Sequence, residues 1–550
     1  MRTSSDSVPK NRCSLHGAAA VLLLFAAACS SATVETAPGD AVEVAEEAVT
    51  LTHVTPESRL QKCSQDPRVM AGLVGTDVCA GADIFFRETF GGNGRTCGSC
   101  HPMANNLTID APFIEQLHAQ KPADPLFVAE LNPQLSQLET EDLRASGAIL
   151  ENVDGFEDPP NKFVSRAVNH LFSLQTSILR DPGDGTSAAI VERTGWGGDG
   201  APGNGALRFF LDGAIKQHFT KNLLRRVNVD FQLPNDLERD LTAAFQRSLG
   251  RLTELNLPSV RITDAQAEEG RTLFLDPQRA GRCNLCHSNA GANFIDTRLN
   301  RNFDTFTRFE SGDPPVHGGT VNGEFFADGG FDAVTPTPTI PGSVDSEGNP
   351  VFTMNALGNG TFSVPPLIEA ADTGPFFHNN SAGPQIEDAV NFYGGFFFGI
   401  SPAVQALDQR FGAPLEVLNA DQAIKIARFL RVLNAAFNTS LTIQRLEAVQ
   451  TLIRQFQNGF VPIQQKLVEL AIAEIDDALA VLQGAPVTTI QTDVQTELTA
   501  AKAQALLALS ATTHTDRNTR VLNALTRMRT GRGRLGTNLT FLMGQGNLMF

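Results

Sequence analysis

Two short segments of the chain place cysteine and histidine at a spacing that could do redox chemistry. Residues 96–101 read TCGSCH and residues 282–287 read RCNLCH. In Cys-x-x-Cys-His the two thiols can add to the vinyl groups of haem while the histidine ligates its iron, so the spacing is typical of c-type haem attachment. We therefore predict two covalent haems. The residues that would hold them are Cys97, Cys100, His101, Cys283, Cys286 and His287.

Two other uses of Cys-x-x-Cys have to be weighed against haem. A zinc ribbon needs two such pairs that converge as four ligands, and a thioredoxin-like dithiol does not need the histidine that follows. Both copies here carry that histidine. The haem interpretation is favoured, more so if the chain is exported.

The overall composition is that of a large folded protein. A chain of 550 residues with 42% hydrophobic residues can bury extensive cores, so we expect two or three domains. The formal net charge of -17 argues against nucleic acid as a partner, because phosphates demand clusters of Lys and Arg. Basic proteins or neutral molecules are more suitable partners.

The N-terminus has the layout of a secretion signal. Arg2, Lys10 and Arg12 precede an uncharged apolar run over residues 17–28, which is too short to span a bilayer. Residues 26–30, AAACS, are similar to a bacterial lipoprotein signal with Cys29 as the lipidated residue, and simple cleavage after an alanine is the alternative. We predict an exported protein, either periplasmic, secreted or an outer-membrane lipoprotein.

Cys63 and Cys79 are left over when the haem motifs, the leader and Cys29 are accounted for. In an oxidising compartment such a pair is expected to form a disulfide. This bridge would brace the chain just before the first haem motif, and its role would be structural.

The apolar pattern predicts a mainly α fold with two cytochrome c-like modules. Residues 81–86 before the first motif are echoed by residues 270–274 before the second, and Thr263 with Gln266 fits a capping box that opens the second of these helices. Further helices are predicted by apolar periodicity. They cover residues 163–179, 205–226, 420–430, 443–482 and 499–510.

A third stretch carries a family resemblance. Residues 362–367 read FSVPPL, residues 372–380 read DTGPFFHNN and residues 386–393 read IEDAVNFY. Together with the haem motifs, this pattern resembles the bacterial di-haem cytochrome c peroxidase superfamily, which includes the enzymes that mature methylamine dehydrogenase and the di-haem rubber oxygenases. The resemblance spans residues 79–437, and the long chain beyond it points to the rubber-oxygenase branch.

The resemblance implies roles for several single residues. A distant C-terminal histidine, His514, would be the first-ranked sixth ligand of the second haem, and Tyr393, the only tyrosine, the second-ranked one. Without the resemblance, His514 is an exposed loop histidine and Tyr393 a buried core residue. Trp196, the only tryptophan, would bridge the haems, and a core tryptophan is the alternative.

The resemblance also implies a reactive pocket at the first haem and a calcium site. Residues 207–219 would line that pocket, where His218 could act as a general acid or base. The candidates there are Phe209, Phe210, Gln217 and His218. The backbone carbonyls of Thr373 and Pro375 would bind calcium, with Asn132 as a partner. His118 could fold back as a further iron ligand, although its surroundings look solvated.

These inferences predict an exported di-haem oxidoreductase that activates dioxygen or peroxide at the first haem and oxidises an apolar alkene, either a small molecule or a polymer. A di-haem peroxidase fed by a small redox protein and an electron-transfer cytochrome are the alternatives. The glutamate expected of a peroxidase is missing at Gln217 and His218. The predicted domains are a signal peptide (1–28), a tether (29–55), two cytochrome c-like haem domains (56–255 and 256–437) and a helical C-terminal extension (438–550).

Overall fold

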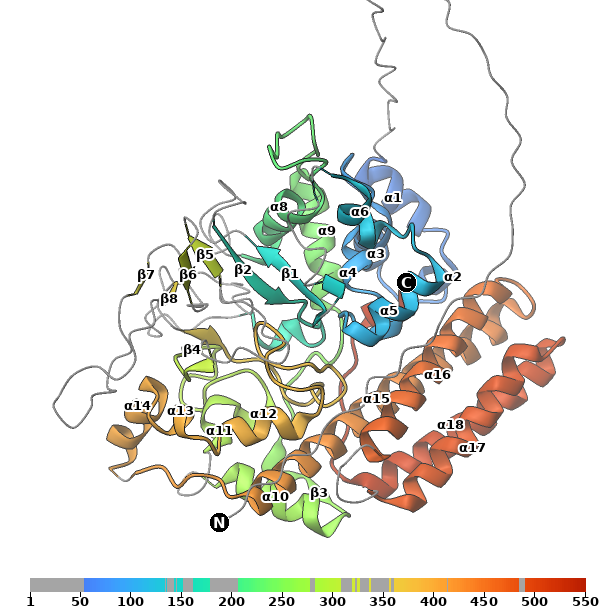
Figure 1. The fold of residues 1–550 in the computed structure, drawn as a ribbon. Coiled ribbons are helices and arrows are strands. Elements are labelled where there is room, and N and C mark those ends of the chain that lie inside the picture. The colour runs from blue at the N-terminus through green and yellow to red at the C-terminus, as the bar shows by residue number, and fades with distance from the viewer. Residues whose placement is uncertain are drawn as a thin grey trace, which may run out of the picture. The chain divides into compact units, whose positions relative to one another are not determined.

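The structure is a computed structural model, and the residues from 54 onward are described with several gaps (Figure 1). The described ranges are 54–133, 135, 143–144, 146–151, 162–178, 206–276, 282–307, 319–321, 324–326, 336–337, 356–357, 361–412, 414–483 and 490–550. Within them the chain is mainly helical, which confirms the mainly α class, and the two cytochrome c-like domains stay a prediction. Among the described helices, none is both long and apolar enough to span a membrane.

The first haem motif lies among the helices of the N-terminal part. Helix α3 precedes the motif and packs against α9, which opens with a capping box between Asn235 and Glu238. The helices are α1 (Pro56–Cys63), α2 (Pro67–Met70), α3 (Thr76–Arg87), α4 (Cys97–Cys100), α5 (Ala111–Gln120), α6 (Val128–Leu131), α8 (Leu207–His218) and α9 (Asp236–Arg247). Short 3-10 turns join them at Met103–Asn105, Pro125–Phe127 and Leu174–Thr176.

The second motif lies in a similar setting. Helix α10 precedes it and packs against the first half of α15. The helices here are α10 (Ala265–Leu275), α11 (Cys283–Cys286), α12 (Ile386–Phe392), α13 (Phe396–Gly399), α14 (Pro402–Phe411) and α15 (Ala420–Phe456). Further 3-10 turns cover Leu257–Ser259 and Ser288–Ala290.

The sequence echo before the two motifs corresponds to a shared packing contact. A Cβ atom added to Gly81 in α3 would lie 2.0 Å from the backbone oxygen of Leu241 in α9. A Cβ atom added to Gly270 in α10 would lie 1.9 Å from the backbone oxygen of Lys425 in α15. Each helix that leads to a haem motif therefore crosses a neighbour at a glycine, because any larger residue would push the two backbones apart.

The C-terminal residues form a helical bundle, and the chain after it contacts the helices around both motifs. Helices α15, α16 (Val461–Gln483), α17 (Thr492–Ser510) and α18 (His514–Leu535) lie side by side (Figure 1). Strand β10 (Gly536–Thr537) then pairs with β3 (Arg261–Ile262) just before α10. The guanidinium of Arg68 near the N-terminal helices donates to the backbone oxygen of Leu548, 2.9 Å away. After the 3-10 turn Gln545–Leu548 the chain ends beside α3, where Arg87 donates to the backbone oxygen of Phe550.

The predicted helix over residues 163–179 is wrong. Residues Lys162–Ala167 form strand β2, which pairs antiparallel with β1 (Ala148–Glu151) and β5 (Gly319–Val321), and β6 (Glu324–Phe326) extends this sheet. Aromatic and β-branched residues at 163 and 164 favour a strand once partner strands are available. The remaining strand pairs are β4 (Asn302–Phe303) with β9 (Phe362–Ser363) and β7 (Pro336–Thr337) with β8 (Ala356–Leu357).

Other predicted boundaries also shift. The N-cap of α10 is Asp264, whose side chain accepts from the backbone N–H of Ala267, and not the predicted Thr263. The helix predicted over residues 205–226 ends at His218. The run predicted over residues 443–482 is interrupted between Phe456 and Val461. The tether and the N-terminal signal lie outside the described residues.

The predicted disulfide between Cys63 and Cys79 is confirmed. It joins α1 to α3 across a sequence separation of 16 residues, and both cysteines are buried. The bridge therefore holds the N-terminal helix against the helix that leads to the first motif.

We expect the Cys63→Ala/Cys79→Ala double variant to lose about 3 kcal/mol of unfolding free energy, because an open loop of this length gains that much chain entropy when the protein unfolds. Urea denaturation of the variant and the oxidised parent measures the difference. If the variant and the reduced parent lose the same unfolding free energy, the crosslink is the cause. An unchanged urea midpoint of the variant contradicts this prediction.

A buried ion pair fixes α10 against α15. Arg428 donates from Nε and Nη2 to the two carboxylate oxygens of Asp264, at 2.7 and 2.6 Å. Burial opposes ionisation of Asp264, but the hydrogen bonds from Arg428 and from the backbone of Ala267 outweigh it and lower the pKa of this carboxyl. The ionised form is therefore favoured in the folded protein.

The Asp264→Asn variant is expected to lose about 3 kcal/mol of unfolding free energy, since removal of one partner leaves Arg428 buried without its counter-ion. Because the pKa of Asp264 is lowered on folding, its contribution is present above about pH 4 and is lost as the pH falls further. Denaturation curves from pH 7 to pH 2 should converge for parent and variant. The exposed Asp421→Asn change, which breaks a surface pair with Lys425, is the control and should cost little.

Candidate functional site

The first motif forms a single helical turn that ends at the predicted iron ligand. The backbone N–H of Thr96 donates to Ser99 Oγ at 3.0 Å, which starts the turn α4. His101 follows α4, and its Nδ1 donates to the backbone oxygen of Leu107, 2.7 Å away. Asn106 and Leu107 have left-handed backbones, with φ of 53° and 55°, so the chain turns back over the imidazole. The hydrogen bond from Nδ1 of His101 to Leu107 leaves Nε2 as the nitrogen that can ligate a metal.

The His101 ring is half-buried and packs beside an aromatic side chain. Its centroid is 6.0 Å from that of Phe85 in α3. Burial lowers the pKa of His101 to about 4, against the hydrogen bond to Leu107, and the charge of His218 lowers it further. The imidazole is therefore neutral at physiological pH, as a metal ligand must be.

The second motif repeats this arrangement. His287 follows the turn α11, and its Nδ1 donates to the backbone oxygen of Pro365 at 3.0 Å, with Gly291 as a weaker partner at 3.3 Å. Burial lowers the pKa of His287 to about 4. Pro365 belongs to the FSVPPL segment, so this segment orients the second histidine. Again Nε2 is the nitrogen left for a ligand.

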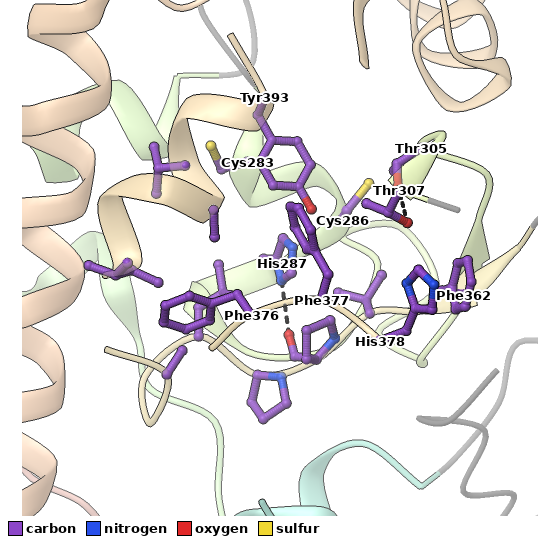
Figure 2. Close-up of a pocket in the computed structure, with 18 of the residues that line it drawn as sticks. Cys283, Cys286, His287, Thr305, Thr307, Phe362, Phe376, Phe377, His378 and Tyr393 are labelled. Carbon is purple, nitrogen blue, oxygen red and sulfur yellow. Dashed lines mark hydrogen bonds between the residues drawn. The ribbon is translucent and has the colours of Figure 1, made fainter. Parts of the chain in front are cut away.

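A cavity of about 240 Å³ lies beside the second motif (Figure 2). Cys283, Cys286 and His287 line one part of it, and most of its other walls are apolar. These include Phe274, Val364, Leu367, Phe376, Ile386 and Leu430. A largely apolar cavity bordered by a histidine and two thiols has the lining that the predicted covalent haem would require.

Tyr393 lies in this cavity, at the C-terminal end of α12 (Figure 2). Burial raises the pKa of its phenol, and the nearby thiols of Cys286 and Cys283 raise it further. Tyr393 is therefore a neutral phenol within electrostatic reach of both cysteines of the second motif. The structure thus brings together the motif and the second-ranked ligand candidate.

The first-ranked candidate, His514, does not line this cavity. It is the first residue of α18 and is half-buried there. The other end of α18 leads to β10 beside β3, next to α10. A helix of 22 residues is about 33 Å long, so His514 lies far from the end that reaches the second module. The prediction of His514 as a ligand is therefore not supported by its position.

The four cysteines of the two motifs form no disulfide within either pair. Burial raises the pKa of Cys97, Cys283 and Cys286 to about 12 in each case. A redox dithiol needs the opposite shift, toward the thiolate. In the described part of the chain no group of three or more His, Cys, Asp or Glu side chains is placed to hold a metal ion, so the two motifs do not converge as a zinc site.

Helix α8 brings His218 toward the first motif. The backbone oxygen of His218 accepts from Asn93 Nδ2 at 3.0 Å, and Asn93 lies in the loop that leads to Cys97. Gln217 is buried, and its side-chain oxygen is 3.5 Å from an Arg225 nitrogen. The backbone of His218 thus lies beside the loop that leads to the first motif, and the reactive pocket assigned to His218 and Gln217 stays a prediction.

The two phenylalanines of α8 are placed less favourably for a reactive pocket. The ring of Phe209 faces the guanidinium groups of Arg208 and Arg239, whose carbons lie 5.0 and 5.8 Å from its centroid. This is the crossing of α8 and α9, where Arg239 also pairs with Asp212. Phe210 is half-buried. Packing between helices accounts for the contacts of Phe209.

The remaining predicted residues are placed as follows. Thr373 and Pro375 line the cavity of the second motif, and the calcium ion assigned to their carbonyls stays a prediction. Asn132 Nδ2 donates to the backbone oxygen of Lys221 at 3.0 Å. His118 packs edge-on against Phe127, and its Nδ1 lies 3.2 Å from a guanidinium nitrogen of Arg144. Trp196 lies outside the described residues.

Two cavity residues were missed at the sequence level. His378 lines the cavity and stacks on Phe362, with ring centroids 4.2 Å apart. It stands in the DTGPFFHNN segment, which could have singled it out. His170 also lines the cavity, but no motif or spacing surrounds it in the sequence.

Comparisons of the chain with protein-family models, with curated proteins and with solved structures found no match.

The position of the two ligand candidates gives a direct prediction. In the haem-loaded protein, Tyr393→Phe should alter the absorption and electron paramagnetic resonance spectra of the second haem, because the phenol lies in its cavity. His514→Ala should leave both spectra unchanged. A spectral change confined to the His514 variant would contradict this placement.

Proposed function

We propose that this protein is an exported di-haem c-type oxidoreductase. The observation that carries the proposal is the pair of matched motifs, in each of which a half-buried, neutral histidine donates from Nδ1 to a backbone carbonyl. This is the arrangement by which proteins fix a metal-ligating histidine. Two neighbouring thiols accompany each histidine.

The residues present fit haem at both motifs. Cys97 and Cys100 would hold one haem through thioethers and His101 would ligate its iron, and Cys283, Cys286 and His287 would do the same for the other. When bound, haem supplies one-electron chemistry and the activation of oxygen or peroxide. The chain's own contribution is to orient the two imidazoles and to exclude water with apolar walls.

The disulfide supports export. Bridges such as Cys63–Cys79 form and persist in oxidising compartments, and c-type haem attachment fits the same setting. Together with the basic and apolar N-terminus, this supports a periplasmic, lipid-anchored or secreted protein.

An aromatic hollow at the surface supports an apolar substrate. Phe377, Phe392, Phe396 and Phe397 line it, and the Phe396 side chain is 67% exposed. Phe377 lines both this hollow and the cavity of the second motif, so the two are neighbours. Exposed aromatic surface of this kind suits an apolar molecule such as an alkene.

Reduction of peroxide is the second candidate function, and His218 is the observation that favours it. Its imidazole lies within electrostatic reach of His101 and could carry a proton to or from a peroxide at the first haem. An electron donor would then be required, such as a small redox protein.

The haem content is the first test. We expect two haems per chain by the pyridine haemochrome assay, and one in each of the variants Cys97→Ala/Cys100→Ala and Cys283→Ala/Cys286→Ala. Purified protein without covalent haem would overturn the proposal.

The reaction type is the second test. Incubation with apolar alkenes under oxygen, without added reductant, should give cleaved carbonyl products, and Phe377→Ala should change the yield. If alkenes are untouched while peroxide is consumed at the expense of a reduced cytochrome, and His218→Ala slows that turnover, the peroxidase candidate replaces the oxygenase.

A further inference from the structure

A short segment that begins with Ala167, the last residue of strand β2, and ends at His170 contacts the surroundings of both motifs. Its Ala167 N–H donates to the backbone oxygen of His378 at 2.7 Å, on the side of the second cavity. Its Val168 backbone oxygen accepts from the hydroxyl of Thr108, in the loop that orients His101. Val168 also belongs to the apolar cluster against which Cys100 of the first motif packs. The segment therefore contacts both sites.

His170 ends this segment. Its side chain is buried, with 8% of its surface exposed, and it lines the same cavity as Cys283, Cys286 and His287. Its ring centroid is 6.2 Å from that of Phe172. Burial lowers the pKa of His170 to about 3, and the charges of His101 and Arg251 lower it further. His170 is thus a neutral imidazole in the second cavity and within electrostatic reach of the first iron ligand.

A buried polar network continues from this point to the second motif. Arg251 donates from Nε to Glu369 Oε1 at 2.7 Å, and Ser173 Oγ donates to the same oxygen at 2.6 Å. Both charged side chains are fully buried. Glu369 lies four residues after Pro365, whose carbonyl orients His287. Contacts of the residues on both sides of His170 in the chain, Val168 and Ser173, therefore hold the segment that carries it.

We infer that His170 is the residue through which the two haem sites exchange electrons, an inference that rests on the proposed function. The path runs from the iron ligand His101 to the His170 imidazole and on to the second cavity. One electron leaves the reduced haem and arrives at the oxidised one, and no bond forms or breaks in His170. The imidazole stays neutral, because its burial disfavours protonation.

The test measures electron redistribution between the haems in the intact, haem-loaded protein. A light flash generates reduced flavin, which delivers a single electron to the protein. The absorbance bands of the two haems then report the transfer of that electron. We expect His170→Leu, which removes the ring at similar volume, to retain two haems and to lose the fast inter-haem phase. His118→Leu, a histidine of α5 outside the cavity, is the matched control and should keep that phase.

Each other outcome decides against the inference. An unchanged fast phase in His170→Leu with both haems bound overturns it, and loss of the phase in Trp196→Phe alone assigns the path to the tryptophan. Parent protein without haem overturns the proposed function and this inference with it. If His170→Leu does not fold, His170→Gln, which keeps a polar side chain without the ring, must lose the fast phase, and its retention would also overturn the assignment.

Discussion

The two bonds from histidine Nδ1 to a backbone carbonyl are the constraint on which the rest of the structure depends. A haem-ligating imidazole must present Nε2 in one orientation, so the carbonyls of Leu107 and Pro365 must be fixed in space. Both belong to loops, and a loop keeps one conformation only when other elements hold it. Thr108 is tied to Val168, and Leu367 donates to the backbone oxygen of Ala290, 3.0 Å away.

Helix α15 is the element that holds several of these loops at once. Most of its residues are buried, and several of its polar side chains bind residues of other segments. Arg428 pairs with Asp264, Arg431 with Glu387, and Asn438 donates to Asp372 at 2.6 Å. Asp372 begins the DTGPFFHNN segment. The side-chain nitrogen of Asn106, the residue before Leu107, lies 3.5 Å from the backbone oxygen of Asp372. A buried helix with satisfied polar groups fixes the position of its partners more sharply than apolar contact alone.

The C-terminal bundle extends this role rather than supplying a ligand. Arg445 in α15 is fully buried, pairs with Glu474 in α16, and contacts the sulfur of Met103 two residues after His101. The final residues return to Arg68 and Arg87 in the first module. The chain beyond residue 437 therefore braces the first motif, whereas a resemblance to rubber oxygenases had assigned His514 to the second one.

Local patterns were enough to predict many elements. The two Cys-x-x-Cys-His turns, the disulfide, the mainly helical class and the glycine echo at residues 81 and 270 all depend on neighbouring residues or on a simple count of cysteines. The strand at residues 162–167 was missed because its partners lie far away in the sequence, and a strand gains its hydrogen bonds only from them.

The sequence by itself determined which residues are candidates to carry haem, because each Cys-x-x-Cys-His motif consists of five consecutive residues. The tertiary structure decided what surrounds them. It put Tyr393, His378 and His170 into the second cavity and left His514 at the far end of α18. The physical reason is that a cavity is assembled from segments hundreds of residues apart, and their approach depends on packing between helices that no local pattern records.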